Sequence, residues 1–338
     1  MCLTCAAKLL PGISEALRSA RAALPPAAVD HHLHIQGPDV TAELRRRVAL
    51  SPETFAIFNA GLFQTRTGAD ALEALDAAGI EQGVLLSMAY TFSSHRSTVE
   101  PADVAALTRR ENQFNVDAAA GSGSRLRTFI GVNPFWQGAL DELNFWAGDE
   151  GVTGLKLHMG NSGFDWRSND HIERLGMVFS IAQGMRWPVI IHARGDGDYG
   201  EGETKGFIER VLPQAGDTLV QIAHAGGGGG IDEGVLSALD LYADAIEQGA
   251  PGTRQLVFDL AVVLVRDTTD PVNASLLERF VKLARRIGLS RFVIGSDWPS
   301  LLPPLEHNEL SESQIDFTDD EWRLVLANRA AYMNERHH

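Results

Sequence analysis

Five histidines and one aspartate of this 338-residue chain stand at or near the ends of short apolar segments, where side chains can converge on one ion. Imidazole is the commonest metal ligand in proteins, and several neutral imidazoles with one carboxylate suit Zn²⁺, or Mn²⁺ with less selectivity. A site that also leaves one position open for water is catalytic in type, because structural zinc sites are closed. The set predicts one catalytic divalent ion and consists of His32, His34, His158, His192, His224 and Asp297.

The spacing in the first of these segments, VDHHLHI, brings two imidazoles to one face. Alternate residues of a strand share a face, so Asp30, His32 and His34 lie together and the residues between them lie opposite. His32 and His34 are therefore expected to point together at one ion. The same alternation puts Lys156 and His158 on one face of the segment GLKLH.

Eight short segments rich in apolar and β-branched residues predict strands. Amphipathic segments with helical spacing separate them, and this alternation predicts a parallel sheet covered by helices. The predicted strands are Ala28–Ile35, Gln82–Met88, Arg127–Asn133, Gly151–His158, Pro188–His192, Leu219–His224, Leu256–Ala261 and Phe292–Asp297. The predicted helices are Ala69–Ala78, Pro101–Ala120, Gly138–Ala147, Asp170–Gly184, Lys205–Leu212, Asp232–Gln248, Asn273–Ile287 and Thr318–Met333.

Eight strand–helix pairs predict an α/β fold of the (β/α)8 TIM-barrel type, with the active site at the carboxyl ends of the strands. We expect residues 1–26 to be an N-terminal extension and residues 27–335 to form a single barrel domain. The longest departure from the pattern is 36–68, which follows the first strand and holds a short helical piece, Thr41–Val48. An insertion there overhangs the active-site mouth as a lid or specificity loop; packing on the barrel rim is the alternative.

The charge balance restricts the partners. Lys and Arg number 29 against 44 Asp and Glu, which gives a formal charge of −15. Such a surface disfavours nucleic acid and anionic membranes, and no apolar run of about 20 residues predicts a membrane span. We expect a cytoplasmic enzyme that acts on a small molecule. A removed export signal would change the expected location. Cys2 and Cys5 form a CxxC without a second pair, and no function is assigned to it.

Four sequence motifs carry a family resemblance. They are Asp30-x-His32-x-His34, His192 in VIIHARG, His224 in VQIAHAGG and Asp297 in VIGSDWP. In this order, on strands one, five, six and eight, they resemble the amidohydrolase superfamily. The resemblance is strongest to the branch with carboxymuconate-semialdehyde and resorcylate decarboxylases and pyrone-dicarboxylate lactonase, and it extends from about Ala27 to Met333.

The resemblance implies a ligand set. His32, His34, His192 and Asp297 would hold a single divalent ion, and His224 would lie beside it, toward the substrate. Binuclear members of the superfamily carry a carboxylated lysine on the fourth strand, for which Lys156 is the candidate here. The alternative for Lys156 is a charge inside the barrel, paired with Asp30 or Asp259. Related barrels often pair, so a homodimer is implied as well.

The same constellation serves two reactions. In hydrolysis of a lactone, ester or amide by a metal-activated water, Asp297 takes the proton from water and passes it to the leaving group, while His224 stabilises the oxyanion. In nonoxidative decarboxylation of a small aromatic or muconate-type acid, Asp297 or His224 protonates the carbon that loses CO₂. We favour hydrolysis and keep decarboxylation as the alternative.

Residues near the strand ends are candidates for binding the substrate, which could carry a carboxylate. Arg194 could pair with that carboxylate through two hydrogen bonds or form an ion pair with Asp196 or Asp198. The full set of candidates is His158, Asn161, Arg194, Tyr199 and Trp298. Behind the ligands we expect Asp30, Lys156 and Asp259, the last bonded to a ligand histidine.

Overall fold

The computed structural model describes residues 24–56, 58–195 and 200–334. Within them, eight parallel strands pair in chain order, which confirms the (β/α)8 barrel. Cys2, Cys5 and Tyr199 lie outside the described residues. The strands are β1 (Val29–Leu33), β2 (Gln82–Leu86), β3 (Leu126–Gly131), β4 (Gly154–His158), β5 (Val189–His192), β6 (Val220–Ile222), β7 (Leu256–Asp259) and β8 (Phe292–Val293).

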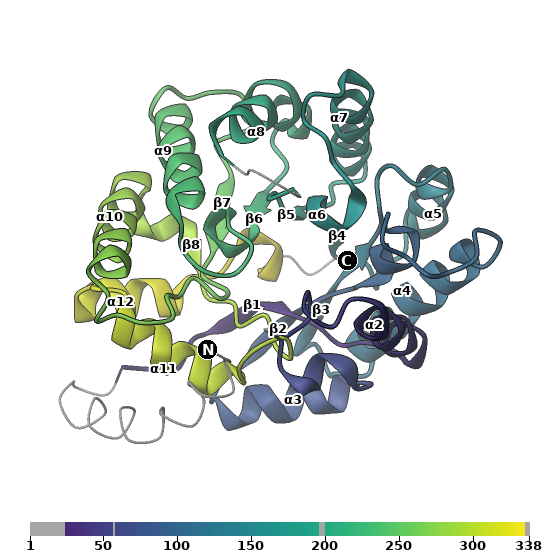
Figure 1. Cartoon of the computed structure of the whole chain (residues 1–338), viewed down its shortest axis with the longest axis horizontal. Helices are drawn as coiled ribbons and strands as arrows, with labels where there is room; N and C mark the ends of the chain where they lie inside the picture. Colours follow the sequence, from purple (N-terminus) through teal and green to yellow (C-terminus); the bar gives the residue numbers. More distant parts are fainter. Residues whose placement is uncertain (1–23, 57, 196–199, 335–338) are drawn as a thin grey trace.

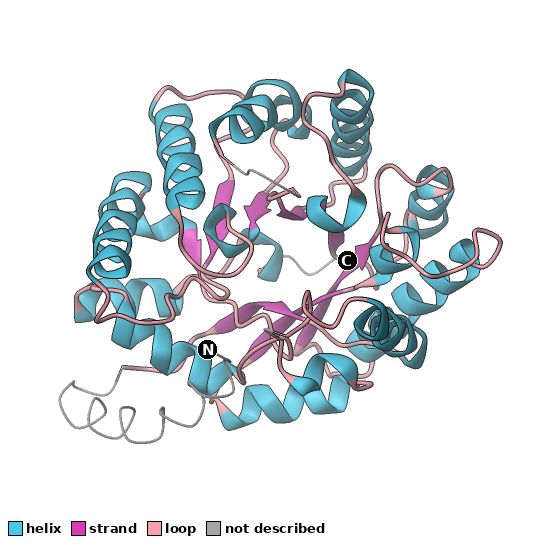
Figure 2. Ribbon diagram, viewed as in Figure 1, coloured by secondary structure: helices cyan, strands magenta, loops and turns pink. Residues whose placement is uncertain are grey.

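Helices surround the strands on the outside of the barrel (Figures 1 and 2). Each predicted helical segment contains a helix, but two segments differ in detail. Residues 205–212 start within α8 and continue as a π-turn, and residues 318–333 end early as α12 followed by a short 3₁₀ turn. The helices are α2 (Pro38–Leu50), α3 (Gly68–Ala77), α4 (Val104–Ala120), α5 (Ala139–Trp146), α6 (Met159–Ser162), α7 (Asn169–Gly184), α8 (Glu201–Gly206), α9 (Glu233–Glu247), α10 (Pro271–Ile287), α11 (Pro304–Gln314) and α12 (Asp319–Ala327).

Backbone hydrogen bonds join β1 to the residues that follow β8. His31 N–H donates to the Ile294 carbonyl at 2.8 Å, and Asp297 N–H donates to the His32 carbonyl at 2.8 Å. The His31 ring also spans this seam, with Nδ1 3.0 Å from the Ile294 oxygen. These bonds bring the carboxyl ends of the first and last strands together, so residues almost 270 positions apart share one rim.

The strand alternation sorts side chains into two layers. Leu155 and Leu157 of β4 pack into the large core between barrel and helices. Inside the barrel, a separate apolar cluster that includes Val84, Phe129 and Ile190 closes the amino-terminal end. Polar side chains on the inward face therefore stand above an apolar floor and face the carboxyl-terminal opening.

The insertion over residues 36–68 is a packed part of the rim. Its ends meet, because Arg66 N–H donates to the Gln36 carbonyl at 3.0 Å. The predicted helical piece is longer than expected and forms α2. The buried Glu43 carboxylate of α2 accepts a hydrogen bond from Thr98 N at 2.8 Å and one from Arg47 Nε at 2.9 Å. The bond from Thr98 fastens α2 to the loop that follows β2, and the bond from Arg47 lies within α2.

Glu111 of α4 anchors the start of the insertion and should make stability depend on pH. Both its carboxyl oxygens accept from Gly37 N, at 3.2 and 3.1 Å. Burial raises the pKa of Glu111 to about 8, although the bonds from Gly37 and Asn115 oppose the rise. Because the folded pKa is raised, the stability contributed by the protonated form is lost as pH rises toward 8.

Glu111→Gln keeps the neutral form at every pH. The variant should therefore gain stability over wild type progressively between pH 5 and pH 9, by about 2–4 °C in Tm for each kcal/mol relieved. Thermal melts across this range measure the difference, and Glu150→Gln at an exposed position is the control. Parallel Tm profiles of wild type and Glu111→Gln would contradict the assignment.

Candidate metal centre

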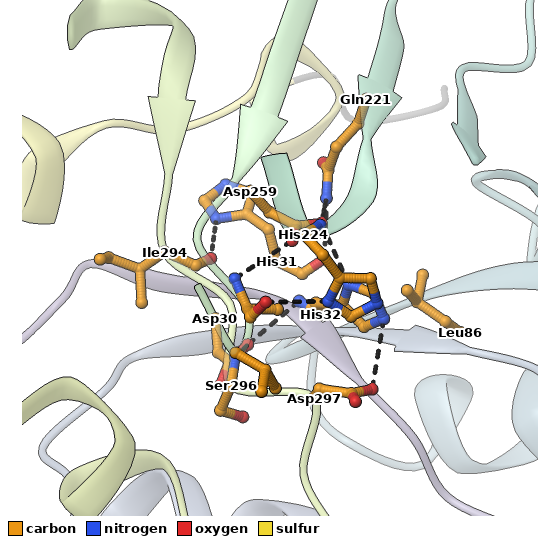
Figure 3. A network of polar contacts seen from close by, with 12 residues as sticks. Asp30, His31, His32, Leu86, Gln221, His224, Asp259, Ile294, Ser296 and Asp297 are labelled. Carbon is orange, nitrogen blue, oxygen red and sulfur yellow. Dashed lines mark hydrogen bonds and ion pairs between the residues drawn. The ribbon is translucent and has the colours of Figure 1, made fainter. Parts of the chain in front are cut away.

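Three side chains from distant segments meet at the carboxyl end of the barrel. His32 lies on β1, His224 follows β6, and Asp297 follows β8. One ligand atom from each lies within 4.8 Å of the other two (Figure 3). His34 joins from the next inward position of its segment, with its Nε2 atom 3.1 Å from Asp297 Oδ1; the same oxygen is 3.4 Å from His32 Nε2.

The far side of each imidazole is held by an acceptor. His32 Nδ1 lies 3.0 Å from Asp259 Oδ2, His34 Nδ1 lies 2.6 Å from the Leu86 carbonyl, and His224 Nδ1 lies 2.8 Å from the Ala261 carbonyl. Oxygens of these types accept, so each Nδ1 donates its proton. Burial, together with the Lys156 charge, lowers the pKa of His32 to about 3, so this ring is neutral near pH 7.

The donor set fits a divalent cation. A neutral imidazole that donates through Nδ1 carries a lone pair on Nε2. The Nε2 lone pairs of His32 and His34 therefore face the carboxylate of Asp297 across 3.1–3.4 Å. The nitrogen lone pairs and the negative carboxylate repel one another unless a cation lies between them. Imidazole nitrogen together with carboxylate oxygen is a donor set that binds zinc and manganese.

Three of the strand ends have strained backbone. His224, Val262 and Asp297 adopt positive φ values of 54°, 54° and 57°. This left-handed conformation costs of order 1–3 kcal/mol for each residue other than glycine and persists where the surroundings fix it. Here the N–H groups are fixed: His224 N donates to Asp259 Oδ1 at 2.8 Å, and Val262 N donates to His307 Nε2 at 2.9 Å. This backbone conformation directs the side chains of His224 and Asp297 toward the opening of the barrel.

Asp259 connects the centre to the interior of the barrel. Its Oδ2 atom accepts from His32 Nδ1 and from Gln221 Nε2, the latter at 2.8 Å. Gln221 Oε1 in turn accepts from the Tyr332 hydroxyl at 2.6 Å. Burial raises the pKa of Asp259, but the hydrogen bonds that its carboxylate accepts from the His32 ring and from His224 N outweigh burial and hold the pKa below its usual range. Asp30 lies on β1, two residues before His32, and its Oδ1 atom accepts a hydrogen bond from His32 N at 3.0 Å.

The other two rim histidines stack on each other. The rings of His158 and His192 are 3.9 Å apart between centroids and nearly parallel. The His192 ring lies 5.0 Å from the His224 ring. Burial lowers the pKa of both stacked rings well below the usual value. Among the described residues, the group whose ligand atoms lie within 4.8 Å of one another contains His224, which was predicted to lie beside the ion. It does not contain His192, a predicted ligand, whose ring lies next to that of His224.

A cavity of about 750 Å³ opens above the cluster. The insertion supplies one wall, which includes Leu44, Phe55 and Phe58. The loop after β2 adds Tyr90, and burial raises the pKa of this phenol. The cavity therefore has an apolar wall facing a floor of imidazoles and charges.

Several predicted substrate residues line this cavity. His158, Asn161 and Arg194 do so. Arg194 pairs with Asp232 at 2.7 Å, a partner that the sequence analysis did not consider, while Asp196 and Asp198 lie outside the described residues. The Asn161 backbone N–H donates to His158 Nδ1 at 3.2 Å and so orients that ring.

Two expectations need correction. Trp298 is not among the described residues that line the cavity. It is 8% exposed and packs in the core, and the Arg66 guanidinium lies over its ring at 5.7 Å. Lys156 does line the cavity. No carboxylate of the described residues lies within 4.0 Å of its ammonium group, so the expected pair with Asp30 or Asp259 is not formed.

Several residues of the site were not predicted from the sequence. Gln221 alternates with outward apolar residues on β6, so the period-two pattern could have marked it as an inward polar group. Tyr332 lies near the end of the predicted helix Thr318–Met333, and nothing in that pattern marked it as part of the site. Arg47 lines the cavity from α2 and is 5% exposed, but a charged residue on a predicted surface helix gave no signal.

The family model described as Amidohydrolase matches residues 29–328, and the chain belongs to this family. The match spans all eight strands and every residue of the metal cluster. The chain is thus an amidohydrolase-superfamily metal enzyme, for which a divalent metal site is expected. No curated protein matches the sequence.

Solved structures of low sequence identity share the fold. One is a probable 2-pyrone-4,6-dicarboxylic acid hydrolase from Acinetobacter baumannii with citric acid bound, with 18% identity, 88% of this chain and 96% of that chain covered, and a TM-score of 0.53. A 5-carboxyvanillate decarboxylase from Sphingomonas paucimobilis has 14% identity, coverages of 92% and 98%, and a TM-score of 0.57.

A third solved structure contains a metal. It is a dihydroxybenzoic acid decarboxylase from Polaromonas sp. JS666 with manganese and the inhibitor 2-nitroresorcinol, with 12% identity, coverages of 90% and 95%, and a TM-score of 0.56. In the described part of this chain, no helix combines the length and apolar character needed to cross a membrane.

Removal of the Asp259 charge should weaken metal binding. Asp259→Asn loses the carboxylate that orients His32, and such partners of ligand histidines typically contribute about 10- to 100-fold in metal affinity. Competition with a chromogenic chelator measures the change in the manganese dissociation constant. Asp217→Asn, at a position 80% exposed, is the matched control and should bind as wild type does. Unchanged affinity in Asp259→Asn would show that the carboxylate does not support the ligand.

Proposed function

We propose that the protein is a metal-dependent hydrolase that cleaves a C–O or C–N bond at the carbonyl of a small carboxylate-bearing molecule. The observation that carries the proposal is the pair of imidazole lone pairs facing the Asp297 carboxylate at 3.1 and 3.4 Å. His32, His34, His192 and Asp297 would hold the ion, with His224 beside it or among the ligands. Zinc and manganese are the ions to test.

The bound ion would supply a Lewis acid that polarises the substrate carbonyl and lowers the pKa of water. The chain itself supplies the base. Burial opposes ionisation of Asp297, but a proton on His34 Nε2, which a bound cation would replace, donates a hydrogen bond that holds the pKa of the carboxyl well below its usual range. An ionised Asp297 is suited to take a proton from water and to return it to the leaving group.

His224 and the cavity wall complete the proposed machinery. The left-handed backbone of His224 turns its ring toward the cavity, with Nδ1 committed to the Ala261 carbonyl. Its free Nε2 edge can orient water or the reacting carbonyl. The insertion over 36–68 would act as a lid that excludes water and sets specificity, with Phe55 and Phe58 against the apolar part of the substrate.

Decarboxylation of a small aromatic acid is the second candidate. The aromatic wall from the insertion suits a planar ring, and two of the similar solved structures are decarboxylases of carboxyvanillate and dihydroxybenzoic acid. This reaction needs an acid that protonates carbon, whereas the Asp297 carboxylate beside a bound cation is suited to accept a proton. We therefore rank hydrolysis first.

A paired assay tests the proposal. Manganese- and zinc-loaded protein is incubated with lactones, esters and amides of small carboxylic acids and with aromatic acids, while hydrolysis is followed by proton release and decarboxylation by CO₂. Hydrolysis without CO₂ supports the first candidate, and CO₂ release from the free acids supports the second.

Asp297→Asn should lower kcat by roughly 10²- to 10⁴-fold, the usual contribution of a general base. Its circular dichroism spectrum should match that of wild type, because the backbone bond from Asp297 N to the His32 carbonyl does not involve the carboxylate. Asp217→Asn is again the exposed control. Full activity in Asp297→Asn would contradict the assigned role.

A further inference from the structure

Lys156 is an unusual charge for the interior of this barrel. Its side chain is 1% exposed, and its neighbours in register on β3 and β5 are Gly131 and Ile190, which offer no polar side chain. Ile190 belongs, with Phe129, to the apolar cluster inside the barrel. A buried ammonium requires a counter-charge, because desolvation without a partner is costly. Lys156 is one of the residues that line the cavity, so an anion in the cavity can supply the counter-charge.

The carboxylates that act on Lys156 are committed elsewhere. Asp259 and Asp297 exert attractive charges on it, yet no carboxylate oxygen of either lies within 4.0 Å of the ammonium. Asp259 accepts from His32 and Gln221, and Asp297 faces the imidazole nitrogens of the metal centre. With a cation bound, Asp297 would be neutralised further. Lys156 would then be a cation without a protein counterion.

Other cations of the cavity differ in this respect. Arg47 pairs with Glu43 at 2.9 Å, and Arg194 pairs with Asp232 at 2.7 Å. Each guanidinium already has a carboxylate partner in the protein. An anion in the cavity would therefore have to compete with that carboxylate for the guanidinium. Lys156 has no such competitor among the described residues.

We infer that Lys156 is a catalytic residue that binds an oxyanion of the substrate, a carboxylate or phenolate, on the floor of the cavity beside the metal centre. The inference rests on the proposed metal-dependent function. It assigns to Lys156 direct contact with substrate instead of a place behind the ligands. The ammonium donates charge-assisted hydrogen bonds to the anion and so fixes the substrate relative to Asp297 and His224.

Binding of anions to manganese-loaded protein tests the inference without knowledge of the natural substrate. Calorimetry measures the affinities of citric acid, 2-nitroresorcinol and 2,6-dihydroxybenzoic acid for wild type and for Lys156→Met, which keeps the length of the side chain without its charge. We expect Lys156→Met to bind at least one of these ligands roughly 10- to 100-fold more weakly, the usual effect of losing a charge-assisted bond. Citric acid has no phenol and 2-nitroresorcinol has no carboxylate, so the ligand that is weakened identifies the oxyanion.

Metal content separates this inference from the proposed function. Lys156→Met should retain the manganese stoichiometry of wild type, and absence of manganese from wild type would count against the function itself. Lys282→Met, an exposed lysine removed in the same way, should bind the anions as wild type does. If Lys156→Met does not fold, Lys156→Gln replaces it.

Three results would overturn the inference. The first is equal anion affinity in the variant and wild type, and the second is a wild-type protein that binds none of the three ligands. The third is a second equivalent of metal in wild type that Lys156→Met removes, since Lys156 would then be a carboxylated, bridging ligand.

Discussion

The metal end of the barrel depends on one buried carboxylate. Asp259 is fully buried, and an ionised group there is stable only if donors surround it. Its two oxygens accept from the His32 ring and the Gln221 amide on one side, and from the backbone N–H groups of His224 and Ala261 on the other. One group thus fixes the tautomer of a ligand and the strained turn that carries His224.

That constraint extends in both directions along the barrel axis. Toward the apolar cluster inside the barrel, Gln221 links Asp259 to the Tyr332 hydroxyl, so a residue near the end of the chain supports the metal centre. Toward the opening, His32 and His34 present lone pairs to Asp297. The proposed function depends on an ion bound by these nitrogens and on a substrate that fits between this ion, the Lys156 ammonium and the aromatic wall of the insertion.

The sequence predicted the barrel because alternation and helical periodicity are local signals, and every observed strand overlaps its predicted segment. Helix α11 was missed because its segment, PLEHNELSESQ, is mostly polar and has no apolar stripe. The convergence of the histidines followed from strand ends sharing a rim. A bond from Asp259 to a ligand histidine was expected and is formed, but the particular histidine could not be predicted, since the His32–Asp259 contact joins residues 227 positions apart and depends on packing.

The most direct test of the metal centre is anomalous diffraction from crystals of the full chain soaked in manganese. We expect a single manganese peak bounded by Asp297 and the Nε2 atoms of the surrounding imidazoles, with the His32 ring still bonded to Asp259 through Nδ1. A crystal with no peak there, or with His32 turned so that Nε2 meets Asp259, would contradict the central claim that this network presents imidazole lone pairs to a metal ion.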